Sequence, residues 1–325
     1  MKGLESTDRE SWLKSIKLRD VNFAILLGAL VPSILIPFTG LPYLEFIMMY
    51  FFAYAIYTAS WDLLYSYSGQ LSLGQALPFG LGAFFTIMLA QLLKFPLVPS
   101  AVVGTLGAAV VGGGIGATTI RLKPGYQGIA ILLFSQVLYW ISLIVYGEEG
   151  LSIFSAAPPS RMTMYFSGVA IFGLALFATY LIQNSNYKLK LLAIKGDNLA
   201  ANVCGINVSF HKAVVFFLSS LLAGLGGTYY AVFTSHVDFT VFVVPNSFLP
   251  IGMAIVGGMG FLGGPIIGSA IISVIINILP IWYSLAVTYF IYGIVVIVIL
   301  KLRPTGIVGL LQRRSRKGSS EVVKG

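Results

Sequence analysis

The residues best suited to chemistry in this sequence are small and uncharged, and they gather between two long apolar stretches. They are Ser68, Gly69, Gln70, Ser72 and Gln75. Hydroxyl and amide groups can line a polar route, because uncharged donors and acceptors bind a passing solute without holding it tightly. The same residue types also form hydrogen bonds between helices and allow close packing in a bilayer. The cluster therefore has two interpretations, a translocation path or a packing seam.

Enzymatic chemistry is not indicated by the motifs. No glycine-rich stretch is followed by Gly-Lys-Ser or Gly-Lys-Thr at the spacing of a nucleotide-binding loop. No serine–histidine or paired-carboxylate pattern suggests catalysis, and 2 histidines and 1 cysteine leave few metal ligands. We therefore expect a protein that is not an enzyme and holds no cofactor or metal of its own.

Two acidic residues, Glu45 and Asp62, lie in or beside apolar stretches. Burying a charge in lipid is costly, so such groups are candidates for function. Both lie near the ends of predicted membrane spans, where a side chain can reach the interface. A structural or interfacial role is the simpler interpretation of each.

The longest polar interruption, residues 184–211, separates two apolar parts of the chain. Within it, Asp197 can cap a short helix over residues 198–203, and Gly205 can end that helix. A helix of about two turns is marginal in water by itself, so it needs something to dock on. We expect the segment to dock on a soluble partner that drives the membrane part.

Composition sets the class of the protein. The chain has 325 residues, of which 57% are hydrophobic and 10% charged; a soluble domain has about 25% charged residues. The sequence therefore predicts an all-α polytopic membrane protein. Ten stretches approach the roughly 20 residues that a bilayer core requires: 21–38, 44–64, 74–93, 97–120, 128–146, 165–183, 212–233, 246–262, 265–281 and 284–300.

The basic residues predict the topology. If the chain starts inside, all but two of its 20 Lys and Arg residues lie in cytosolic segments or at their borders, the exceptions being Lys94 and Arg161. This asymmetry follows the positive-inside rule and explains the net charge of +9 without invoking nucleic acid. The predicted parts are a cytosolic tail (1–20), a first half of six spans (21–183), a cytosolic loop (184–211), a second half of four spans (212–300) and a basic cytosolic tail (301–325).

Two glycine-rich stretches interrupt the predicted spans, at residues 66–75 and 257–268. Gly/Pro-interrupted segments in both halves of a transporter can mark the transport path. The two stretches share no convincing sequence, so we infer no repeat. Residues 69–75 fit either a cytosolic turn or a broken helix at membrane depth.

Several of these patches together resemble the LivM-type permease subunits of branched-chain amino-acid ABC importers. A glycine–glutamine motif comes first, followed by a cytosolic coupling segment, a glycine-rich span, a late glycine motif and an Arg-Pro-x-Gly end. In this sequence they read Ser68 to Ala76 with Phe79 to Ala83, then Ala193 to Lys195, Asp197, Leu199 to Ala201 and Gly205 to Val208, then Leu218-Ser219 and Ala223 to Gly227, then Gly257 to Gly260, Gly263, Pro265 and Gly268, and finally Arg303, Pro304 and Gly306.

This resemblance implies a complex with a homologous second permease subunit, two cytosolic ABC ATPases that consume ATP, and an extracytoplasmic substrate-binding protein, in a prokaryotic cell membrane. It also implies that the short helix couples to an ATPase, with contacts expected at Lys195, Asp197, Asn198, Ala200, Ala201 and Gly205. ATP-driven closure would then rock the spans between inward-open and outward-open states.

The sequence departs from the family pattern at two places. Gly196 and Asn198 stand where the family usually has glutamates, and Gly147-Glu148-Glu149-Gly150 replaces the usual Thr-Gly-Gly of an outer loop. The substrate is therefore open among branched-chain or related amino acids, urea and short amides. A different class, an ion-coupled secondary transporter without ATPase partners, is the alternative; it usually needs intramembrane charges or broken helices at the ion site.

Overall fold

A computed structural model of the chain describes residues 25, 27–152, 160–303 and 305–308. After a first apolar helix (Leu27–Thr39) that ends in the turn η1 (Ile36–Thr39), the described helices are α2 (Pro42–Asp62), α3 (Ala76–Leu92), α4 (Leu97–Thr119), α5 (Pro124–Tyr146), α6 (Arg161–Gln183), α7 (Asn186–Gly196), α8 (Asn198–Val203), α9 (Val208–Thr234), α10 (Val244–Gly257), α11 (Gly263–Ile278) and α12 (Leu285–Leu302). Shorter elements are the π-helical turn η2 (Leu63–Tyr67), the turns η3 (Phe239–Phe242) and η4 (Leu279–Ile281), and the strands β1 (Leu151–Ser152) and β2 (His236–Val237).

The apolar helices overlap the ten predicted ranges, in order. Seven of the described helices are long and apolar enough to cross a membrane: Pro42–Tyr67, Leu97–Thr119, Gly125–Tyr146, Arg161–Gln183, Val208–Thr234, Gly263–Ile281 and Leu285–Leu302. Leu27–Thr39, Ala76–Leu92 and Val244–Gly257 are shorter apolar helices. The prediction of a helical membrane protein is confirmed, and one two-residue strand pair, β1 with β2, was not predicted.

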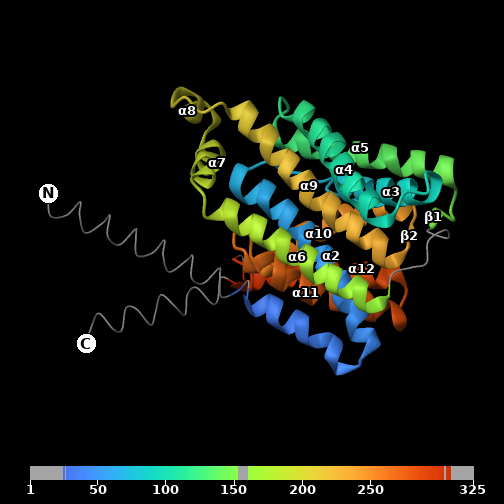
Figure 1. Ribbon diagram of the computed structural model, residues 1–325. Helices are drawn as coiled ribbons and strands as arrows, with labels where there is room; N and C mark the ends of the chain where they lie inside the picture. The colour runs from blue at the N-terminus through green and yellow to red at the C-terminus, as the bar shows by residue number, and fades with distance from the viewer. Residues whose placement is uncertain (1–24, 26, 153–159, 304, 309–325) are drawn as a thin grey trace, which may run out of the picture.

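Helix α9 lies at the centre of the bundle and packs on α2, α3 and α4 (Figure 1). Its glycines explain the close approach. A Cβ at Gly227 would meet the Phe79 carbonyl oxygen of α3, and one at Gly226 would lie 3.0 Å from the Ala53 carbonyl oxygen of α2. Small residues let membrane helices come together by backbone contact, which is where their packing energy arises. The hairpin of α10 and α11 packs on the other side of α2.

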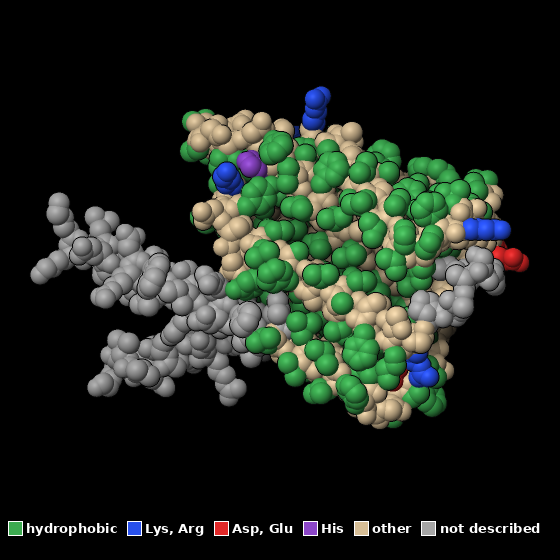
Figure 2. All heavy atoms as spheres, in the orientation of Figure 1, with side chains coloured by type: hydrophobic (Ala, Val, Ile, Leu, Met, Phe, Trp, Pro, Cys, Tyr) green, Lys and Arg blue, Asp and Glu red, His purple; other side chains and the backbone are tan. Residues whose placement is uncertain are grey.

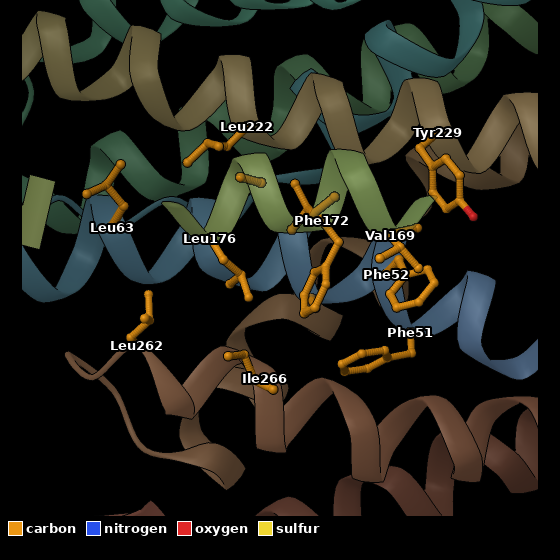
Figure 3. Packing of buried hydrophobic residues seen from close by; sticks show 14 of the residues in the cluster. Phe51, Phe52, Leu63, Val169, Phe172, Leu176, Leu222, Tyr229, Leu262 and Ile266 are labelled. Atoms are coloured by element: carbon orange, nitrogen blue, oxygen red, sulfur yellow. The ribbon is translucent and has the colours of Figure 1, made fainter. Parts of the chain in front are cut away.

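A core of aromatic and aliphatic side chains joins α2, α6, α9 and α11 (Figure 3). The ring of Phe172 on α6 lies 5.3 Å from the rings of both Phe51 and Phe52 on α2, measured between centroids. Leu222 of α9 and Ile266 of α11 belong to the same cluster. Through this core α2 packs against α6 of the first half of the chain and against α9 and α11 of the second half.

The segments between helices gather at two opposite ends of the bundle (Figure 1). At the end that carries α7 and α8, Gln70 bonds to the Lys212 carbonyl and Asp62 to the Gly260 amide. At the other end β1 pairs with β2. The first end holds loops predicted to be cytosolic and the second holds loops predicted to lie outside. On the face seen in Figure 2, hydrophobic side chains cover the region between the ends, and charged side chains lie towards the ends.

Candidate functional site

The structure places the short helix α8 at the predicted residues, and both of its ends are capped. The carboxylate Oδ1 of Asp197 accepts hydrogen bonds from the Leu199 amide at 2.7 Å and the Ala200 amide at 3.2 Å. Gly205 has a φ of 82°, and the Ile206 amide donates back to the Ala201 carbonyl at 3.1 Å. This is a Schellman-type end, in which glycine takes the left-handed conformation that other residues avoid. A two-turn helix is thus held in shape by its own caps.

The outward side of α8 carries two large apolar side chains. Leu199 is 78% exposed and Val203 is 88% exposed, and residues four apart lie on the same side of a helix. Ala201 is buried at 3% exposure and faces the chain's own interior. Of the six residues expected to contact an ATPase, Ala201 is covered by the chain itself, and Lys195, Asp197, Asn198, Ala200 and Gly205 are exposed. The coupling role of these six residues stays a prediction. The sequence reasoning missed Leu199 and Val203, although their spacing was a usable signal.

A second helix in the polar loop, α7, was also missed by the sequence analysis. Its Leu191 and Ile194 are buried at 0% and 2% exposure, three residues apart on one face. The helix packs against α6, α9 and the π-helical turn η2. Near its start, Lys188 lies over the Tyr67 ring at 5.5 Å, and burial lowers the pKa of the Lys188 ammonium. The loop is therefore a pair of docked helices, and α7 connects α8 to the membrane helices.

A hydrogen-bonded joint ties α7 to α2. Lys195 Nζ donates to the Ser66 carbonyl at 2.8 Å. That carbonyl lies where α2 and its π-helical turn end, and terminal carbonyls have no partner within their helix. A cation at this end also interacts favourably with the helix dipole. The alkyl part of the same lysine packs on Gly69, where a Cβ would lie 3.1 Å from Lys195 Cγ.

Hydrogen bonds at the same end of α2 also bind the second glycine-rich stretch, residues 257–268. Asp62 Oδ1 accepts a hydrogen bond from Ser66 Oγ at 2.6 Å and one from the Gly260 amide at 2.8 Å. The Tyr67 hydroxyl donates to the Gly260 carbonyl at 2.9 Å. Asp62 is 1% exposed, so its side chain is buried and does not reach an interface. The two glycine-rich stretches, which share no sequence, meet through these bonds.

The predicted polar residues form a hydrogen-bonded stretch inside the bundle, which we call the seam. It consists of Ser68, Gly69, Gln70, Ser72 and Gln75. Gln75 Nε2 donates to Ser60 Oγ and to Ser219 Oγ, each at 2.9 Å. Gln70 Nε2 donates to Ser68 Oγ at 3.0 Å and to the Lys212 carbonyl at 3.2 Å. The residue between them, Ser72, accepts a bond from the Trp61 indole through its carbonyl at 2.8 Å.

The course of the seam favours one of the two interpretations of residues 69–75, the broken element. The segment is not helical, and it starts beside Lys195 and Lys212. It ends at Ser219, eleven residues into α9, which at 1.5 Å per residue is about 16 Å along that helix. The stretch therefore runs inward from the end of the bundle as a broken element. Non-helical backbone at membrane depth is tolerated where it is buried in protein.

In this conformation the seam is closed. Ser68, Gln70, Ser72 and Gln75 are each at most 2% exposed, and Gly69 is half-buried. Most of their polar groups bond within the chain, although the Ser72 hydroxyl has no partner among the described residues. The translocation role of these five residues stays a prediction.

Fold and site together define a class of protein. An apolar multi-helix body carries a small docked helix pair at one end and a polar, broken stretch inside, which is the architecture of a membrane transport component. The chain matches the family described as "Branched-chain amino acid transport system / permease component" over residues 43–300. Because this match covers most of the chain, the protein belongs to that permease family and is not an enzyme. The resemblance seen in the sequence is confirmed at this level.

Two curated relatives show the range of the family. The probable branched-chain amino acid transport permease protein LivM of Methanocaldococcus jannaschii is 22% identical over 326 residues, covering 82% of this chain and 93% of the relative. The D-allose transport system permease protein AlsC of Escherichia coli is 27% identical over 246 residues, covering 64% of this chain and 74% of the relative. The names of the two relatives specify different solutes, so similarity alone does not choose the solute of this chain.

Proposed function

We propose that this chain is the permease subunit of an ABC importer that moves a small solute inward, with branched-chain or related amino acids as the first candidates. The observation that carries the proposal is the exposed apolar face of α8. Leu199 and Val203 are almost fully exposed on a helix that is capped at both ends and seated on α7 and α9. Exposed apolar side chains held in a fixed geometry are typical of a protein-binding surface. A cytosolic ATPase is the partner that this family context supports.

The contacts support a route for the mechanical coupling. ATP-driven closure of the ATPases moves α8 and the attached α7. Lys195 then acts on the end of α2, and Asp62 extends the link to the turn before α11. The membrane helices whose movement is coupled most directly to the ATPase are therefore α2 and the α10–α11 hairpin.

The assembly proposed for this subunit has four kinds of component. They are a homologous second permease, two ABC ATPases docked on the cytosolic side, an extracytoplasmic binding protein and the lipid of a prokaryotic cell membrane. All ten apolar helices cross or enter the bilayer, and both ends of the chain lie in the cytosol. The segregation of the loops to two ends of the bundle supports this topology.

An ion-coupled secondary transporter is the alternative class. It would need acidic groups available to a coupling ion. Asp62 instead accepts two hydrogen bonds, and Glu45 faces Arg161 at 3.7 Å. The family match and these occupied carboxylates favour the ABC importer.

Substitutions on the exposed face of α8 test the proposal. In the reconstituted complex, we expect Leu199→Asp with Val203→Asp to abolish ATPase binding and ATP-dependent uptake. Each apolar side chain contributes about 1.5–3 kcal/mol when buried at an interface, so the pair should weaken binding by at least about 100-fold. Co-purification of the ATPases and uptake into proteoliposomes are the measurements.

The matched control is Leu199→Met with Val203→Ile, which keeps the face apolar and should keep binding. Membrane insertion should be the same in both double variants, because neither side chain is buried in the chain itself. Full ATP-dependent uptake by the double-aspartate variant would overturn the docking of an ATPase on α8.

A further inference from the structure

Four tyrosines lie between the middle of the bundle and the end opposite α7 and α8. Tyr50 and Tyr54 come from α2, Tyr230 from α9 and Tyr289 from α12; we call them the outer tyrosine cluster. The Tyr50 ring lies 6.0 Å from the Tyr54 ring and 5.9 Å from the Tyr230 ring, between centroids. Tyr54 and Tyr289 pack against the same group of side chains from α10 and α12. All four are half-buried.

Further aromatic and hydrogen-bonded residues connect the outer tyrosine cluster to the seam. Tyr57 stacks on Phe79 with 4.5 Å between ring centroids, and its hydroxyl donates to the Asn246 carbonyl at 3.0 Å. The side-chain oxygen of Asn246 accepts a bond from the Tyr289 hydroxyl at 3.5 Å. Ser60, which binds Gln75, lies one turn further along α2. The tyrosines are therefore placed directly outward of the predicted path.

The depth of the cluster separates it from an interfacial aromatic belt. Tyr54 lies twelve residues after the start of α2 at Pro42, which corresponds to about 18 Å along the helix. Half of a typical hydrocarbon core is about 15 Å. A tyrosine that only anchors a helix at the headgroups would lie nearer the helix end.

Three hydroxyls in the cluster have no hydrogen bond within the described part of the chain: those of Tyr50, Tyr54 and Tyr230. None of the three is sealed completely from solvent. A hydroxyl without a partner is unfavourable in an apolar medium. Three of them together indicate that this region faces water or a polar ligand rather than lipid.

We propose that the outer tyrosine cluster is a solute-binding site of the permease, which the solute occupies after its delivery from outside. This rests on the proposed transport function. The chemistry it fits is a compact solute with a C–H face that stacks on tyrosine rings and with neutral groups that hydrogen-bond to their hydroxyls. Branched-chain amino acids and monosaccharides both offer that chemistry.

Cysteine protection in the reconstituted permease complex tests the site. The chain has 1 cysteine, so Cys204→Ser gives a clean background for Tyr54→Cys and Tyr230→Cys. A charged, water-soluble thiol reagent added from outside should modify both. L-leucine or D-allose, whichever is the solute, should slow the modification by at least about 5-fold. The matched control is Tyr283→Cys, an exposed position near the same end, which should react at a rate that neither solute changes.

The outcomes decide separate questions. Protection by leucine alone assigns an amino-acid site, and protection by allose alone assigns a sugar site. Absence of modification at both positions would place them against lipid or the second permease and overturn the proposal; so would modification that neither solute slows. Because protection needs no ATP, it stays informative even if ATP-dependent uptake fails.

A milder variant covers the case in which the cysteine variants fail to fold. Tyr54→Phe removes one hydroxyl and keeps the ring. Because one neutral hydrogen bond to the solute is lost, the uptake rate of L-leucine or D-allose, whichever the complex transports, should fall by about 5-fold. An uptake rate equal to that of the unsubstituted complex, with ATP hydrolysis also unchanged, would overturn the role of Tyr54.

Discussion

At the scale of single residues, the fold depends on positions that carry almost no side chain. Gly257 on α10 faces α11 so closely that a Cβ would overlap the Gly264 carbonyl oxygen and lie 2.9 Å from the Gly268 amide. These contacts are backbone to backbone, so no flexible side chain can move aside. The α10–α11 hairpin, which carries the Gly260 end of the joint, is held by this approach.

Gly257→Ala should therefore destabilise the protein by about 1–3 kcal/mol, because the two helices must separate to admit the methyl group. Gly293→Ala on α12 is the matched control. Nothing lies within 4 Å of a Cβ there, and alanine favours a helix over glycine by up to about 1 kcal/mol. Unfolding midpoints in the same detergent measure both. Equal midpoints for the two variants would contradict the packing account.

At the scale of elements, α7 and α8 divide two tasks. The short helix presents an apolar surface, whereas α7 carries Lys195, whose ammonium binds the end of α2. A substitution in α7 can thus disturb the transmission of force without touching the docking surface. This separation makes the two helices distinguishable by experiment.

We expect Lys195→Met to leave ATPase binding intact and to reduce the amount of solute moved per ATP hydrolysed by about 10-fold. The physical reason is the loss of a charged hydrogen bond worth about 1.5–3 kcal/mol. Lys195→Arg, which can still donate to the Ser66 carbonyl, should restore much of the ratio. Lys190→Met, an exposed lysine of the same helix, should behave like the unsubstituted chain. A normal transport-to-ATP ratio in Lys195→Met would remove the joint from the mechanism.

At the scale of the molecule, the two ends of the bundle give the chain a direction. Cys204 is exposed beside α8, at the end predicted to face the cytosol. A membrane-impermeant thiol reagent should label it in inverted vesicles and leave it unlabelled in right-side-out vesicles. Bound ATPase should slow that labelling, because Cys204 directly follows Val203. Labelling from the outside would reverse the predicted topology.

The sequence was sufficient for the helices of the membrane and for α8. Long apolar stretches specify spans by composition alone, and Asp197 and Gly205 specify the ends of α8 by local chemistry. It was insufficient for α7, whose buried face has only Leu191 and Ile194 and depends on contacts with other helices. The bond between Asp62 and Gly260 joins residues 198 positions apart, and no local pattern predicts such a contact. Composition also does not show which side of a short helix the chain itself covers, so the burial of Ala201 was not predicted.

The broken stretch before α3 also constrains how the protein is made. Gln75 obtains one of its two hydrogen-bond partners, Ser219, from a helix 144 residues later in the chain. While the ribosome has synthesised only the first six apolar segments, that polar group has no α9 to receive it. We infer that α3 cannot settle in its final position until α9 has been translated and inserted. Packing around Gln75 is therefore completed only after the second half of this permease has entered the bilayer.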